Sequence, residues 1–267
     1  MRTLILGAVV TAALCMTATA AADGGPGPGV AYGWDGVARG NVRIVAVPSV
    51  GWTSIEIVQR RGGRVVNFMN VRGSWGIPLV AFDGTSEALL RDGRTLVLAS
   101  TPSRTLSAPT SFAFVDIKKM RVLRTITVRG SYSFDASSPD RRYLYLVQYV
   151  SNVNINKYRV RAFDLKTNKL LPRIVSDRRS WETTMEGQPI SRVNRDGWAY
   201  TLYGGTARPF IHALDTRHVE AVCIDLPWKS SPKQIYGYRL GWDRAGHLVV
   251  RGKNGRTVVT VQRDLRT

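Results

Sequence analysis

The chain has 267 residues, and its 38 lysines and arginines outnumber 19 aspartates and glutamates, which gives a formal net charge of +19. Two interpretations of this charge stay open: a surface that attracts polyanions, or a solvated surface whose hairpin turns use arginine. No nucleic-acid motif accompanies it, so we expect no nucleic-acid partner. Three histidines without zinc-site spacing, and no phosphate-binding loop or serine nucleophile elbow, predict a protein without metal or cofactor.

The N-terminus predicts export. Arg2 precedes an apolar run at residues 4–14, and residues 18–22 read ATAAA, which satisfies the small-x-small cleavage rule. Because the run is shorter than the roughly 20 residues of a bilayer span, we interpret residues 1–22 as a secretory signal peptide, not an anchor. No later segment is long and apolar enough to cross a membrane, so we expect a secreted, extracellular or envelope-associated protein.

Residues 23–29 read DGGPGPG and form a flexible Gly/Pro-rich leader, and residues 30–267 form one domain. After cleavage Cys223 is the only cysteine, so no intrachain disulfide can form. We expect Cys223 to be a buried small hydrophobic residue in a strand; the alternative is a reactive thiol.

After the leader, the sequence shows the patterns of β-strands, and part of this pattern repeats along the chain. Residues 53–59 and 64–71 predict a hairpin. A longer unit then recurs at residues 87–130, 133–175 and 188–225: a charged turn, an alternating apolar strand, a strand ending in Asp, a basic turn and a further strand. A period in the forties or fifties is typical of propeller blades, and the absence of long amphipathic patterns predicts very little helix.

Two sets of aspartates keep this period. The turn aspartates are Asp92, Asp140, Asp196 and Asp243, with spacings of 48, 56 and 47 residues. The strand-end aspartates are Asp116, Asp164 and Asp215, with spacings of 48 and 51. We expect the strand-end set to accept hydrogen bonds from the amides of the following turns; calcium binding is the alternative.

The pairs SSPDRRYLYLVQY with FDLKTNKLLPRIV, and LLRDGRTLVLAS with FVDIKKMRVLRTITV, resemble the YVTN and WD40-like propeller repeats of secreted bacterial proteins. The resemblance covers residues 79–225 and departs from the repeat at Arg141, where Gly is usual. It implies an all-β fold, a single β-propeller of about five four-stranded blades, and implies no particular activity. We expect a monomer in which residues 30–32 or 42–47 complete the last sheet and so hide open edges.

The innermost strands of such a fold would be residues 83–90, 131–137, 186–193 and 237–242. They carry Asp83, Glu87, Asp135, Glu186, Arg192 and Arg239. Charge on an inner strand costs desolvation unless it is paired or wet. Two interpretations stay open: a ligand pocket at the channel mouth, or a water-filled channel with salt-bridged walls.

An insertion, SDRRSWETTM at residues 176–185, separates the third and fourth units. Insertions on one side of a propeller often carry specific contacts. Arg178, Arg179 and Trp181 therefore form a candidate rim for an anionic or glycan partner, with a plain loop as the alternative.

These features favour a secreted binding module that recognises an anionic cell-wall polymer, a glycan or an envelope protein through the channel mouth and its loops. The alternative is a glycan-active hydrolase or lyase that uses Glu87, Asp135 and Glu186 as channel carboxylates, because such enzymes need paired carboxylates with shifted pKa values. A scaffold without a small ligand is a third interpretation.

Overall fold

The computed structural model describes residues 28–101, 103, 105–204, 208–229, 232–262 and 265. The predicted signal peptide, and residues 23–27 of the predicted leader, lie outside the described residues. Within them the regular secondary structure is almost entirely β-strand, and the short helices are η1 (Gly33–Asp35) and α1 (Pro232–Ile235). None of the helices in this part of the chain is long and apolar enough to span a membrane.

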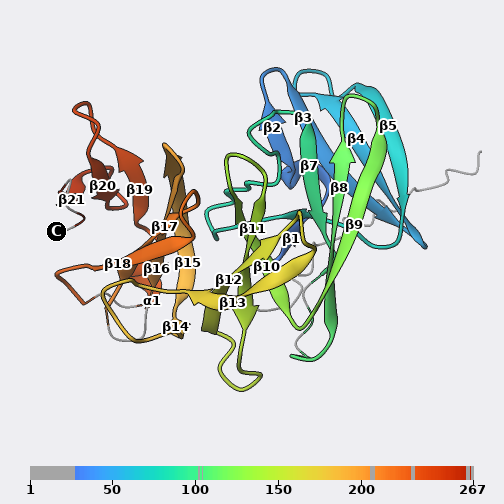
Figure 1. The fold of residues 1–267 in the computed structure, drawn as a ribbon. Coiled ribbons are helices and arrows are strands. Elements are labelled where there is room, and N and C mark those ends of the chain that lie inside the picture. Colours follow the sequence, from blue (N-terminus) through green and yellow to red (C-terminus); the bar gives the residue numbers. More distant parts are fainter. Residues whose placement is uncertain are drawn as a thin grey trace, which may run out of the picture.

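Most strands form antiparallel sheets in which neighbours along the chain pair with one another (Figure 1). The first two such sheets contain β2 (Val37–Arg39), β3 (Val42–Ser49), β4 (Trp52–Gln59) and β5 (Val65–Arg72), then β7 (Thr95–Ala99), β8 (Pro109–Asp116) and β9 (Arg121–Arg129). The third contains β10 (Tyr132–Ser137), β11 (Tyr143–Tyr149), β12 (Lys157–Asp164) and β13 (Lys169–Val175), and β14 (Met185–Glu186) also pairs with β12.

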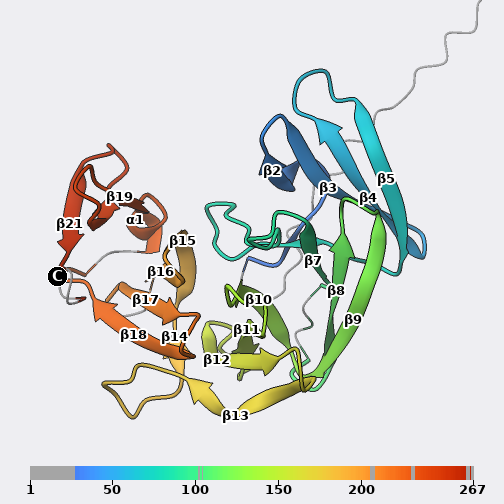
Figure 2. The ribbon, with the colours of Figure 1, turned by 45° about the horizontal axis from the view of Figure 1, so that its top comes forward.

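The fourth sheet contains β15 (Gln188–Arg195), β16 (Trp198–Gly204), β17 (Phe210–Asp215) and β18 (Glu220–Asp225). The fifth contains β19 (Arg239–Trp242), β20 (Leu248–Arg251) and β21 (Thr257–Val261). Figure 2 shows these sheets following one another along an arc, with β2–β5 at one end and β19–β21 at the other. The fold is thus an all-β propeller, as the repeat predicts.

The core lies between successive sheets. In the described part of the chain it divides into four clusters, one at each junction between neighbouring sheets. Examples are Ile44 with Leu96 between the first and second sheets, and Phe112 with Leu146 between the second and third. Among the described residues no cluster joins the fifth sheet to the first, so the arc is open.

The predicted closure of the ring is therefore wrong. β1 (Val30–Ala31) pairs with β6 (Ile77–Pro78), and Val42–Ser49 lies inside the first sheet between β2 and β4. Val30 and Ala31 are buried in the cores beside the second sheet, which holds this segment away from β21. Strand β3 pairs with its nearest neighbours in sequence, which is the pairing that costs least loop entropy.

The role of the strand-end aspartates is confirmed. Oδ1 of Asp116 accepts hydrogen bonds from the backbone N–H groups of Lys118 and Lys119, both at 3.0 Å. Asp164 and Asp215 accept the same bonds two and three residues ahead. Hydrogen bonds from Arg94 also hold the pKa of Asp116 well below its usual range. These side chains hold turns in place, which accounts for their regular spacing.

Arg141, the departure from the repeat, has a left-handed backbone with φ of 60°. Gly93 and Gly197 follow Asp92 and Asp196 in the same way, with φ of 60° and 85°. This conformation costs little for Gly and more for a residue with a Cβ. Nη1 of Arg141 lies 2.9 Å from Oδ2 of Asp92, so the side chain gains an ion pair between two turns.

We expect Arg141→Gly to be more stable than Arg141→Ala by about 1 kcal/mol, because both lose the ion pair and only glycine relieves the backbone strain. Urea unfolding of the two variants measures the difference directly. Equal stabilities would contradict a strained turn at this position.

Candidate functional site

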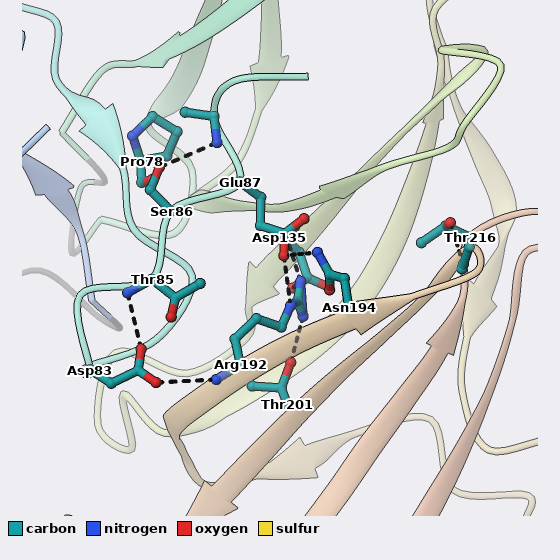
Figure 3. Close-up of polar contacts among 12 residues, drawn as sticks. Pro78, Asp83, Thr85, Ser86, Glu87, Asp135, Arg192, Asn194, Thr201 and Thr216 are labelled. Carbon is teal, nitrogen blue, oxygen red and sulfur yellow. Dashed lines mark hydrogen bonds and ion pairs between the residues drawn. The ribbon is translucent and has the colours of Figure 1, made fainter. Parts of the chain in front are cut away.

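Arg192, on β15, is the centre of a buried polar cluster, and its side chain is 0% exposed. Nη2 donates to Oδ1 and to the backbone oxygen of Asp135, both at 2.7 Å. Nη1 donates to Oγ1 of Thr201 on the adjacent strand β16, at 2.5 Å. Asp135 lies on β10, so this ion pair joins the innermost strands of the third and fourth sheets (Figure 3).

The segment before β7 completes the cluster. Nε of Arg192 lies 3.5 Å from Oε1 of Glu87, which also accepts a hydrogen bond from the side-chain amide of Asn194. The backbone N–H of Arg192 points to Oδ2 of Asp83 at 3.4 Å. Four of the residues expected on inner strands, Asp83, Glu87, Asp135 and Arg192, therefore meet at one place (Figure 3).

Burial and charge act against each other in this cluster. Burial raises the pKa of Glu87, and the nearby charge of Arg192 and the Asn194 amide offset it only in part. Burial lowers the pKa of Arg192, but the nearby carboxylates of Asp135 and Glu87 raise this pKa by more than burial lowers it. The guanidinium therefore stays charged. Oδ2 of Asp135 is buried and accepts no hydrogen bond from the described residues.

The cluster leaves little room for a ligand. The adjoining cavity, lined by Glu87, Arg91, Ser137 and Asn194 among others, has a volume of about 30 Å³. That is enough for roughly one water molecule. At this point on the inner edge, the geometry supports the salt-bridged wall over the ligand pocket.

The expected place of Glu186 is wrong. Glu186 lies on β14, where it pairs with Lys157 of β12, and the inner strand β15 begins later, at Gln188. The chain between the third and fourth sheets first returns across the end of the third sheet. The carboxylates of Glu87 and Asp135 both face Arg192, so the three proposed catalytic acids do not form one site.

Residues 177–179 of the insertion lie at the outer edge of the fourth sheet, and its last residue, Met185, pairs with β12 of the third sheet. Asp177 pairs with Ala221 of the outermost strand β18. Arg178 contacts Glu220 at 3.5 Å, and Arg179 bonds to Asp177 and to the backbone oxygen of Cys223. Trp181 is 89% exposed. Arg178 and Arg179 therefore lie at the outermost strand of this sheet, away from the inner strands, and both arginines are already paired.

Cys223 is half-buried, with Sγ 3.9 Å from Sδ of Met185. Burial raises the pKa of its thiol to about 12. The thiolate is the reactive form of cysteine, so this environment fits the structural role and not the reactive one.

Arg239 lies on β19 and does not join the Arg192 cluster through any hydrogen bond or ion pair between described residues. It lines an open cavity of about 640 Å³ with Tyr236, Arg251, Lys253 and the glycines at 237, 252 and 255. We call this the basic cavity. Sequence reasoning missed Arg251 and Lys253; the signal was the run RGKNGR at residues 251–256, in which basic residues alternate with glycine and asparagine.

No protein-family model and no curated protein matches this chain. Solved structures share limited similarity. Hydrazine synthase of Kuenenia stuttgartiensis is 15% identical, with 82% of this chain and 55% of that chain covered and a TM-score of 0.43. The β-propeller domain of the Trilobed protease from Pyrococcus furiosus is 10% identical, with 84% and 63% covered and a TM-score of 0.43.

TolB from Acinetobacter baumannii is 9% identical, with 81% of this chain and 50% of that chain covered and a TM-score of 0.44. The chain thus spans between half and two thirds of the length of these three structures. Similarity at this level does not extend to ligands or activities, and the propeller assignment rests on the sheets themselves.

We expect Arg192→Met to destabilise the fold by about 3 to 5 kcal/mol, because removing one partner leaves Asp135 and Glu87 buried without a counter-charge. Arg178→Met, which breaks the ion pair with Glu220 between side chains that are 62% and 39% exposed, is the matched control and loses much less. Urea unfolding measures both. A loss for Arg192→Met no larger than that of the control would contradict the role of the buried cluster.

A second prediction concerns pH. Because the folded pKa of Glu87 is raised, the native state binds more protons than the unfolded state between the two pKa values. The free energy of unfolding is therefore higher at pH values below the pKa that Glu87 has in the unfolded chain. It falls as the pH rises through the pKa that Glu87 has in the folded protein. Glu87→Gln keeps the acceptor for Asn194 and removes this slope.

The measurement is urea unfolding of the parent and Glu87→Gln from acid to neutral pH. We expect the difference in unfolding free energy to favour the variant increasingly as pH rises from the unfolded to the folded pKa, by about 1.4 kcal/mol for each pH unit. A difference independent of pH would show that Glu87 is not perturbed.

Proposed function

We propose that this protein is an extracellular binding module for an anionic polymer, of the kind found in cell walls, and that the basic cavity beside the fifth sheet holds it. One observation carries the proposal: Arg239, Arg251 and Lys253 line this cavity together with no acidic residue. None of the ion pairs between described residues involves them.

Neutral partners position the two arginines. Nη1 of Arg239 donates to the backbone oxygens of Tyr236 and Tyr238 at 2.7 and 2.8 Å. Nη2 of Arg251 donates to the backbone oxygen of Trp242 at 2.9 Å. Each guanidinium has five N–H donors, so donors remain for a ligand. A guanidinium held by carbonyls keeps its full charge, which suits bidentate bonds to phosphate, sulfate or carboxylate.

The rest of the chain supports the same ligand class. A net charge of +19 attracts polyanions over a distance, and a local cluster of cations then selects where they bind. The predicted signal peptide and the resemblance to repeats of secreted bacterial proteins favour an extracellular ligand. The hydrolase alternative has no comparable support, because Glu87 and Asp135 both neutralise Arg192.

The test replaces the three cations together, as Arg239→Gln, Arg251→Gln and Lys253→Gln. We expect the parent to bind poly(glycerol phosphate) and not neutral dextran at about 0.15 M salt, where the Debye length is about 8 Å. The triple variant should lose at least about tenfold in affinity, since hydrogen bonds to charged groups are worth about 1.5 kcal/mol or more. Calorimetric titration measures the affinity, and thermal unfolding checks the fold.

The matched control removes the same number of charges from the exposed end of the β8–β9 hairpin, as Lys118→Gln, Lys119→Gln and Arg121→Gln. This control variant should lose less than about threefold in affinity for the polymer, because salt screens charges that lie far from the basic cavity. Equal losses in the two triple variants would assign binding to the overall field and overturn the cavity as the site.

A further inference from the structure

A second cavity lies between the fourth and fifth sheets, at the end where β15 turns into β16 and β19 turns into β20. Its volume is about 250 Å³. Three aromatic and three polar side chains characterise its lining: Trp198, Tyr200, Trp242, Arg195, Asp196 and His247. We call it the aromatic cavity. Arg239 begins β19 and Trp242 ends it, so the aromatic and basic cavities lie at opposite ends of this strand.

The aromatic rings form a corner. The rings of Trp198 and Tyr200 lie 6.1 Å apart at 19°, and Tyr200 meets Trp242 at 5.6 Å and 83°. Trp198 and Tyr200 are two residues apart on β16, so they share the face that packs against the fifth sheet. All three side chains are only half-buried, which leaves ring surface exposed to the cavity.

The charged side chains that line the aromatic cavity, Arg195 and Asp196, are opposite in sign. The Arg195 guanidinium lies 4.0 Å from the ring centre of Trp242, and its Nη1 donates to the backbone oxygen of Gly246 at 2.7 Å. Among the described residues, no hydrogen bond or ion pair engages the Asp196 carboxylate. Nδ1 of His247 lies 3.0 Å from Oδ2 of Asp243, which leaves Nε2 as the imidazole nitrogen for another partner.

From this arrangement we propose that the aromatic cavity binds one ring of a neutral saccharide. A sugar ring has a face of C–H groups, which packs on an aromatic ring, and an edge of hydroxyls, which both donate and accept hydrogen bonds. Asp196 and His247 supply acceptors and Arg195 supplies donors. Ligand pockets for drug-sized molecules have volumes of about 300 Å³ or more, so this smaller cavity suits a single ring.

The same residues disfavour charged ligands. A quaternary ammonium group would have to sit on the rings beside the Arg195 guanidinium, which already lies over Trp242, so the two cations would repel one another. An anion would meet Asp196. The aromatic cavity is thus independent of the basic cavity in position and in ligand chemistry, and the saccharide proposal stands whether or not the anionic polymer binds.

The test is saturation-transfer NMR on the full chain with maltotriose, cellotriose and chitotriose, and with tetramethylammonium as the competing class. We expect transfer to at least one trisaccharide, concentrated on one of its rings, with millimolar affinity and no transfer to tetramethylammonium. Trp198→Leu should weaken binding by about three- to tenfold, the range that an aromatic contact supplies. Trp52→Leu changes a Trp that is 50% exposed on the first sheet, and should leave binding unchanged.

Asp196→Asn is the second variant, because Asp196 has a left-handed backbone with φ of 51°, which asparagine also adopts. It keeps one acceptor oxygen and loses the charge, so binding should weaken while thermal unfolding stays the same. The proposal is overturned if none of the three trisaccharides receives transfer, if Trp198→Leu and Asp196→Asn both bind like the parent, or if tetramethylammonium binds instead.

Discussion

The buried charge of Arg192 constrains how the sheets of this protein are placed. Taking a guanidinium out of water costs several kcal/mol, and only well-placed carboxylates and acceptors offset that cost. Arg192 meets this demand with groups from the third sheet, through Asp135, and from the segment before β7, through Glu87. One side chain thus ties the inner strands of the third and fourth sheets to the segment before β7, and its partners cannot move independently without exposing a buried charge.

The same constraint explains why the inner edge is a poor ligand site and the fifth sheet a better one. Asp135 and Glu87 already bond to the Arg192 guanidinium, and the adjoining cavity has a volume of only about 30 Å³. The fifth sheet packs on the fourth through Leu240 and Val250, and no described core cluster covers its other side. Two cavities of about 640 and 250 Å³ both involve this last sheet.

Local interactions made the propeller predictable from sequence. Each strand-end aspartate bonds to amides two and three residues ahead, and the turn residue after Asp92 or Asp196 needs a left-handed backbone, so the repeat is visible in a short window. The cluster around Arg192 could also be predicted, because charges on inner strands need partners. The place of Glu186 and the open ring could not, since both depend on which distant strand a short segment pairs with.

The net charge of the protein does not show where its unpaired cations lie. A net charge of +19 suggests a uniformly basic surface, but many arginines are paired. Arg94, Arg142 and Arg179 each contact an aspartate that holds a turn, so their charge is neutralised within the fold. Arg251 and Lys253 lie in or beside a hairpin without an acidic partner, and Arg239 faces the same cavity. Lys118, Lys119 and Arg121 also make no ion pair between described residues, so the lack of an acidic partner does not by itself single out the fifth sheet. What distinguishes this sheet is that three cations line one cavity with no acidic side chain among the lining residues.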